Sequence, residues 1–153
     1  DFNECTGTSC VAATDDFNIS ATKVVSELAS GNVILRAYND ILFNAAVTST
    51  SNRNLTLEAG RTIEINANIS LGGGDFNATI NHDSATTGRD VGLAAFAMAS
   101  NTSITTQGGD ISITTGSLTG YNIGRYFSNS NWLMWTRYLS HSIFLLAMNF
   151  SKM

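Results

Sequence analysis

The residues best suited to chemistry lie together in one stretch, "INHDSATTGRDV". His82 and Asp83 lie near its start, and Arg89 and Asp90 lie near its end. A histidine, an arginine and two carboxylates supply a proton carrier and groups that hold polar or charged ligands. A single loop with these residue types is far more often a solvated turn than a catalytic centre. We therefore predict that His82, Asp83, Arg89 and Asp90 contribute to binding, and we predict no catalytic residue.

Other signals for catalysis or cofactor binding are weak. The chain has no G-x-S-x-G, H-E-x-x-H or phosphate-loop pattern. Two Gly-Gly-Asp turns, at 72–75 and 108–110, match only part of a calcium-binding repeat. Cys5 and Cys10 lack the further ligands of a zinc site, and they form either a small local disulfide of an exported protein or two free thiols. We predict no metal and no cofactor.

A repeat of 22 residues organises the chain around this stretch. "GNVILRAYNDILFNAAV" begins at Gly31, and "RNLTLEAGRTIEINANI" begins at Arg53. Residues 32–47 and 54–69 are identical at six of sixteen aligned positions. Further positions, among them Phe43/Ile65 and Val47/Ile69, exchange one large apolar residue for another, so the repeat conserves a pattern of apolar volume. A period in this range is typical of a solenoid or an array.

Each copy alternates apolar and polar residues, which is the period of a β-strand. In the first copy we expect a strand at 33–37, a turn at "YND" and a second strand at 41–47 with Ala45 facing inward. The second copy has its turn at "GRT". A third, degraded copy starts at Phe76 and is followed by a loop from Asn81 to Asp90. Two short Ile-Thr strands then surround a Gly-Gly turn.

Parallel stacking, with one turn of the chain per copy, explains the constant offset. Equivalent residues then lie about 4.8 Å apart in neighbouring turns. Antiparallel hairpins with turns at "YND" and "GRT" are the alternative, but they leave the offset a coincidence. Either end of such a stack presents unpaired strands, so we also expect the isolated chain to associate. Parallel stacking predicts four contacts: Ile41 on Ile63, Phe43 on Ile65, Asn44 on Asn66, and an exposed ion pair of Arg36 over Glu58.

The sequence divides into three parts. Residues 1–30 are a polar lead-in that ends in either one or two helical turns or a short strand. Residues 31–120 are the repeats, and residues 121–153 are an aromatic-rich tail with no Asp or Glu. Arg137 and His141 interrupt the apolar stretch of the tail, which argues against a membrane-spanning helix. The tail is a capping helix, an interfacial amphipathic segment or the product of a reading-frame slip.

Composition limits the partners of the chain. Only 13% of its 153 residues are charged, and the net charge is −4. A binder of the phosphate backbone needs a basic face, so we exclude nucleic acid. Proline is absent, which permits uninterrupted backbone pairing. The chain starts at Asp1 without a visible signal peptide, so we expect a mature or incomplete chain.

The sequence resembles the filamentous haemagglutinin family of large bacterial exoproteins. The match covers roughly residues 18–120 and is carried by the two copies quoted above, by "GGDFNATIN" and by "ITTQGGDISITTGSL". The resemblance implies an all-β fold, a fragment of a right-handed parallel β-helix or solenoid. The amino-terminal secretion domain of the family is not recognisable here, and the tail matches nothing in the family pattern.

The resemblance also implies a function and a location. Members are secreted through an outer-membrane transporter partner, which a region not present here would recognise. We therefore expect an adhesive or structural shaft segment, secreted or held at the bacterial cell surface, with host-cell surfaces or glycans as partners. The alternative is a carbohydrate-active β-helix enzyme, a polysaccharide lyase or hydrolase. Arg61 and Asp83 are 22 residues apart, but no second carboxylate completes an acid/base pair.

Overall fold

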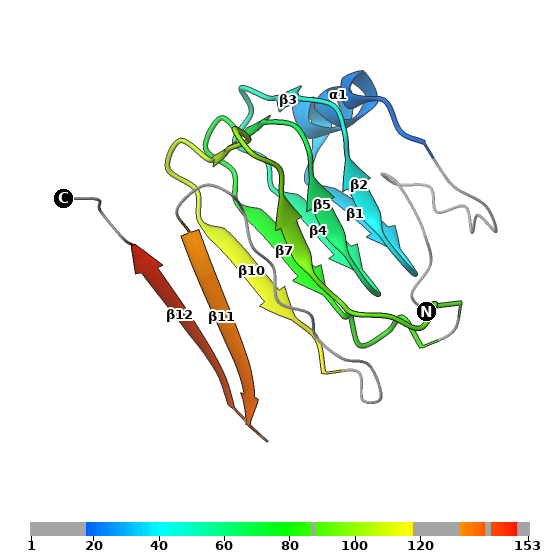
Figure 1. Ribbon diagram of the computed structural model, residues 1–153. Helices are drawn as coiled ribbons and strands as arrows, with labels where there is room; N and C mark the ends of the chain where they lie inside the picture. The colour runs from blue at the N-terminus through cyan, green and yellow to red at the C-terminus, as the bar shows by residue number, and fades with distance from the viewer. Residues whose placement is uncertain (1–17, 87, 118–131, 140–141, 150–153) are drawn as a thin grey trace.

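A computed structural model describes residues 18–86, 88–117, 132–139 and 142–149 (Figure 1). One helix and twelve strands occur in these residues. The elements are α1 (Ala21–Ser30), β1 (Val33–Ala37), β2 (Ile41–Phe43), β3 (Val47–Thr48), β4 (Leu55–Ala59), β5 (Ile63–Ile65), β6 (Ile69–Ser70), β7 (Phe76–Ile80), β8 (Phe96–Met98), β9 (Ile104–Thr105), β10 (Ile111–Thr115), β11 (Trp132–Leu139) and β12 (Ser142–Asn149).

Strands β1 to β10 form three parallel sheets that the chain visits in turn. The strand orders are β1-β4-β7-β10, β2-β5-β8 and β3-β6-β9. Neighbours in a sheet are therefore one turn of the chain apart, as Figure 1 shows for β1, β4, β7 and β10. The protein is thus mostly β, with parallel sheets and few helices, and its architecture is consistent with a parallel β-helix-like fold.

The apolar and amide contacts predicted between the first two copies are confirmed. Ile41 pairs with Ile63, and Phe43 pairs with Ile65, in the β2–β5 ladder. At the following corner, Asn66 Nδ2 donates a hydrogen bond of 2.8 Å to Asn44 Oδ1. The hairpin alternative is wrong, because β1 with β4, and β2 with β5, pair in parallel.

The third copy is present, and its spacing differs from that of the first two. Leu55 pairs with Phe76, 21 residues later, whereas Ile69 pairs with Ile104, 35 residues later. The difference arises mainly from the segment between β7 and β8, residues 81–95, which we call the insert loop. It contains the predicted loop at 81–90. Strand β8 was not predicted, because Phe96 to Met98 lie in the alanine-rich "GLAAFAMAS" and lack β-branched residues.

The second strand of each copy is interrupted by a corner, so the expected single strand over 41–47 is wrong. Residues 44–46 separate β2 from β3, and the exposed Ala45 does not face the core. Small alanines and the stacked Asn44 and Asn66 fit such a corner, because amide side chains hydrogen-bond between turns. Because of this second corner, each turn of the chain contributes three strands, one to each sheet. The sequence had indicated only two strands per turn.

The apolar core lies between the three sheets and is best enclosed at the second turn. Inward side chains of β4, β5, β6 and β7 alternate with outward ones, as the period of two predicts. Leu55, Leu57, Ile63, Ile65, Ile69 and Phe76 are 0% exposed. Each fully buried aliphatic or aromatic side chain contributes about 1.5–3 kcal/mol to folding. The stacked apolar columns are therefore the main source of stability.

A ladder of side chains satisfies backbone groups at the corner before the first sheet. Asn32 Oδ1 accepts a hydrogen bond from the backbone N–H of Asn54, 3.0 Å away. Asn54 Oδ1 accepts one from Asp75 N at 2.9 Å, and Asp75 Oδ1 accepts one from Asp110 N at 2.9 Å. The aspartate of the first Gly-Gly-Asp turn therefore links one turn of the chain to the next.

Helix α1 covers the first turn of the coil. Ser20 caps its N-terminus by accepting from Lys23 N, and Val24 and Leu28 are buried in the core. Ser51 Oγ donates to the Leu28 carbonyl oxygen over 2.7 Å. Of the two conformations left open for this segment, the helix is confirmed and the strand is wrong. The coil consequently has a covered end at β1 and β3, which corrects the expectation of two open ends.

The tail contains two strands in its described residues. Strands β11 and β12 pair antiparallel, with Trp132 opposite Asn149. The helix considered for this segment is wrong there, because tryptophan, tyrosine, isoleucine and phenylalanine favour strands. No helix in the described part of the chain has the length and apolarity needed to cross a membrane. Cys5 and Cys10 lie outside the described residues.

Candidate functional site

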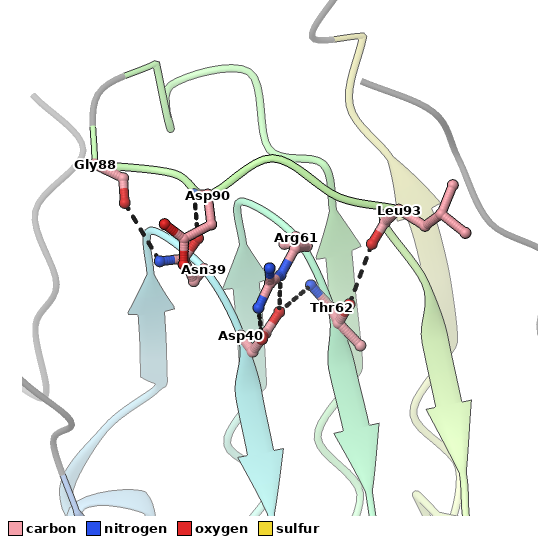
Figure 2. Close-up of polar contacts among 7 residues, drawn as sticks. All are labelled: Asn39, Asp40, Arg61, Thr62, Gly88, Asp90 and Leu93. Carbon is pink, nitrogen blue, oxygen red and sulfur yellow. Dashed lines mark hydrogen bonds and ion pairs between the residues drawn. The ribbon is translucent and has the colours of Figure 1, made fainter. Parts of the chain in front are cut away.

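A cluster of hydrogen-bonded polar residues lies at the corner between the first and second sheets. Asp40 follows β1, and Arg61 follows β4 one turn later (Figure 2). Arg61 Nε donates a hydrogen bond of 2.8 Å to Asp40 Oδ1, and Arg61 Nη2 pairs with Asp40 Oδ2. The backbone N–H of Thr62 also donates to Asp40 Oδ1, over 3.0 Å. This bidentate ion pair therefore links the first two turns of the chain.

The electrostatics of this cluster favour the charged forms of both partners. Burial alone would raise the pKa of Asp40, but hydrogen bonds from Arg61 and Thr62, together with the charge of Arg61, outweigh it and lower that pKa. The hydrogen bond to Asp40 raises the pKa of Arg61 against the effect of burial, and the charges of Asp40 and Asp90 add to it. The cluster is thus a stable ion pair and not a proton donor or acceptor near neutral pH.

The variant Asp40→Asn should lose about 1.5–3 kcal/mol in free energy of unfolding at pH 7, as expected for hydrogen bonds to a charged group. The pKa of Asp40 is lower in the folded chain than its unfolded value of about 3.9. The stabilisation by the Asp40 carboxylate is therefore fully present above the unfolded pKa and is lost as the pH falls through the folded pKa. Urea titrations from pH 7 to pH 2 should show a smaller acid-induced loss in Asp40→Asn than in the parent chain. Equal acid-induced losses in the free energy of unfolding for the two proteins would contradict this prediction.

Hydrogen bonds hold the insert loop against the same corner. Asn39 Nδ2 donates to the Gly88 carbonyl oxygen over 3.3 Å, and Asn39 Oδ1 accepts from Asp90 N over 2.6 Å (Figure 2). Thr62 Oγ1 donates to the Leu93 carbonyl oxygen over 3.5 Å. A loop that leaves the third turn is therefore bonded to residues of the first and second turns.

Arg89 anchors the base of this loop. Its side chain is buried, and Arg89 Nη1 donates to Asn81 Oδ1 over 2.7 Å. Asn81 is buried as well, has a φ of 51° and donates from Nδ2 to the Gly116 carbonyl oxygen over 3.1 Å. Asparagine tolerates this left-handed conformation better than most residues. The Arg89–Asn81 pair connects the loop to the end of β10.

His82 lies beside the ion pair that the sequence predicted between the first two turns. Arg36 and Glu58 are bonded to each other, which confirms their stacking. Their side chains are 31% and 16% exposed, so the expectation of an exposed pair is wrong. His82 Nε2 lies 3.8 Å from Glu58 Oε2.

The four predicted binding residues face different neighbours. Asp83 is exposed, and its Oδ1 accepts from the backbone N–H and the hydroxyl group of Ser117. Asp90 is exposed beside Asn39, whereas Arg89 points inward and His82 faces Glu58. The exposed members of the set are thus Asp83 and Asp90. In the described part of the chain, no group of three or more His, Cys, Asp or Glu residues is arranged to hold a metal ion.

Sequence reasoning did not find the corner cluster. It treated "YND" and "GRT" as turns and compared Arg61 with Asp83, whereas Arg61 is bonded to Asp40. A usable signal was present, because Asp40 and Arg61 have opposite charges at almost the repeat distance, 21 residues apart. The role of Asn39 as an anchor for the loop had no comparable signal.

Comparisons with known protein families, with curated proteins and with solved structures find no match to this chain. The resemblance to filamentous haemagglutinins therefore stays a prediction from the sequence motifs.

Proposed function

We propose that this chain is a length of right-handed parallel β-helix from a secreted or surface-held bacterial exoprotein of the filamentous haemagglutinin kind. It acts as a shaft that displays binding loops, not as an enzyme. The observation that supports this most is the in-register stacking of equivalent residues in three parallel sheets. Such a stack gains stability from each added turn and grows along one direction, which suits a stalk.

The insert loop is the part of the shaft best suited to contact a partner. Loops positioned by a rigid scaffold commonly carry binding residues. Asn39 holds the loop by bonds to Gly88 and Asp90, which leaves the Asp90 side chain exposed. Fixing a loop in one conformation lowers the entropic cost of binding. Asp83 and Asp90 are suited to accept hydrogen bonds from the hydroxyl groups of a glycan.

Binding to immobilised oligosaccharides tests this proposal. The full chain is applied to an array of neutral and acidic glycans, alongside a variant that carries Asp83→Ala and Asp90→Ala. We expect the parent chain to bind a subset of the glycans and the double variant to bind at least about tenfold more weakly, since each lost charged hydrogen bond costs about 1.5–3 kcal/mol. Glu64→Ala, an outward carboxylate on β5 and outside the loop, is the matched control and should bind like the parent.

Three results would contradict the proposal. The first is no retention of the parent chain on any glycan or on cultured host cells. The second is equal binding by the parent and the double variant. The third is cleavage of a polysaccharide that is lost in Asp83→Ala, which would favour the carbohydrate-active enzyme instead.

A further inference from the structure

The insert loop exposes a carboxylate and apolar side chains next to each other. The Asp90 side chain is exposed, and its backbone N–H is held by Asn39 Oδ1 over 2.6 Å. Val91 is 86% exposed and Leu93 is 56% exposed. Figure 2 shows the Leu93 side chain directed away from the corner that holds the loop. A ligand at this part of the loop therefore meets a negative charge and apolar groups together.

The basic side chains close to Asp90 are occupied by partners within the chain. Arg89 is buried and donates to Asn81 Oδ1 over 2.7 Å. Arg61 donates from two nitrogens to the Asp40 carboxylate. The hydrogen bond to Asp40, and then the charges of Asp40 and Asp90, raise the pKa of Arg61 against the effect of burial. Neither arginine is thus available to hold an anionic ligand, which would need such donors.

The other basic side chains that the structure describes do not offset the charge of Asp90. Lys23 is paired with Glu27 on α1, and Arg36 is paired with Glu58. Arg53 is exposed, but it precedes β4, and the loop is bonded beyond the opposite end of that strand. The five residues of β4 span about 16 Å. Salt screens exposed charges over about 8 Å in physiological solution, so Arg53 acts weakly on a ligand at the loop.

We propose that this part of the loop binds saccharides that carry a free amino group and selects against acidic ones. The protonated amine of the sugar donates charge-assisted hydrogen bonds to the Asp90 carboxylate, and such bonds are roughly twice as strong as neutral ones. The C–H groups of the sugar ring cover Val91 and Leu93 and remove apolar surface from water. A carboxylate or sulfate group on the sugar brings like charges together instead, which opposes binding. The inference rests on the proposed binding of glycans and adds the class of glycan to it.

Isothermal titration calorimetry of the full chain with three oligosaccharides of equal length tests the inference. The probes are oligomers of glucosamine, N-acetylglucosamine and galacturonic acid, which are cationic, neutral and anionic at about pH 6. We expect the glucosamine oligomer to bind at least about fivefold more tightly than the neutral one, because hydrogen bonds between charged groups are stronger. The galacturonic acid oligomer should bind at least about tenfold more weakly than the neutral one. Added salt should reduce both differences.

Three variants assign the preference to the loop. Asp90→Asn keeps the size of the side chain and removes its charge, so it should bind the glucosamine and N-acetylglucosamine oligomers equally, within about twofold. Val91→Ser should weaken the binding of all three oligomers by a similar factor, because it removes apolar contact and no charge. Glu64→Gln is the matched control, since it changes the net charge by the same amount on β5, outside the loop, and it should keep the preference of the parent.

Failure of this inference can be told apart from failure of the proposed function. No binding of the glucosamine oligomer, equal binding of the glucosamine and N-acetylglucosamine oligomers, or a preference for galacturonic acid would overturn the inference. Loss of the preference in Glu64→Gln would overturn it as well, because the net charge of the chain and not Asp90 would then be responsible. Binding of the parent chain to another glycan on the array would in each case still support the proposed function.

Discussion

Ile63→Asp should unfold the chain or lower its free energy of unfolding by more than about 4 kcal/mol. Ile63 is 0% exposed and stacks between Ile41 and Phe96 in the second sheet. The change removes about 1.5–3 kcal/mol of apolar burial. It also places a carboxylate in the core, where an unpaired charge costs several kcal/mol. Most domains have only about 5–15 kcal/mol in total, so urea denaturation followed by circular dichroism should detect the loss readily.

Leu42→Asp is the matched control for this change. Leu42 lies in the same sheet, next to Ile41, but its side chain is 55% exposed. The new carboxylate remains in water, so the change should cost no more than about 1 kcal/mol, which includes its repulsion from the Glu64 carboxylate opposite it on β5. Similar losses from Ile63→Asp and Leu42→Asp would mean that the inward and outward faces of β2 and β5 are assigned incorrectly.

Gly74→Ala should lower the free energy of unfolding by about 3 kcal/mol or more, at the upper end of the range for overpacking. A Cβ at Gly74 would lie 2.0 Å from the Arg53 carbonyl oxygen and 2.3 Å from its carbon. Both atoms belong to the backbone of the preceding turn, so no side chain can move to make room. The corner before β7 stacks so closely on the corner before β4 that only glycine fits.

Gly31→Ala separates this steric effect from the general effect of replacing glycine. A Cβ at Gly31 would have no heavy atom within 4 Å, and its φ of −171° is open to any residue. The change should be neutral or should stabilise the chain by about 0.4–1 kcal/mol, because alanine reduces the freedom of the unfolded chain. Thermal denaturation of both variants checks the pair. Equal melting temperatures for Gly74→Ala and Gly31→Ala would contradict the close stacking of the corners.

The sequence predicted the parts of the fold that depend on repetition. The constant offset placed Ile41 on Ile63 and Arg36 over Glu58, because equivalent residues must coincide when each copy makes one turn. It did not locate the corner at 44–46, because Ala45 and Ala67 fit an inward position as well as a corner. Strand β8 was also missed, since Phe96 is the one strong strand former in a segment rich in alanine.

The candidate site was predicted only in part, for a physical reason. The sequence identified the loop with His82, Asp83, Arg89 and Asp90, but residues close together in a loop need not point the same way. Arg89 is bonded inward to Asn81, while Asp83 is bonded to Ser117. The partner of each side chain is set by which residues of the neighbouring turns lie next to the loop. The length of the insert determines this position, and that length does not follow the repeat.

Nuclear Overhauser contacts between methyl groups test the central claim most directly. In a chain with labelled isoleucine and leucine methyl groups, we expect contacts between Ile41 and Ile63 and between Leu35 and Leu57. These pairs are neighbours only if each copy makes one turn and lies in parallel on the next. If these contacts are missing, and β1 instead shows antiparallel contacts with β2 across Asn39 and Asp40, the stacked coil and the shaft proposed from it are both wrong.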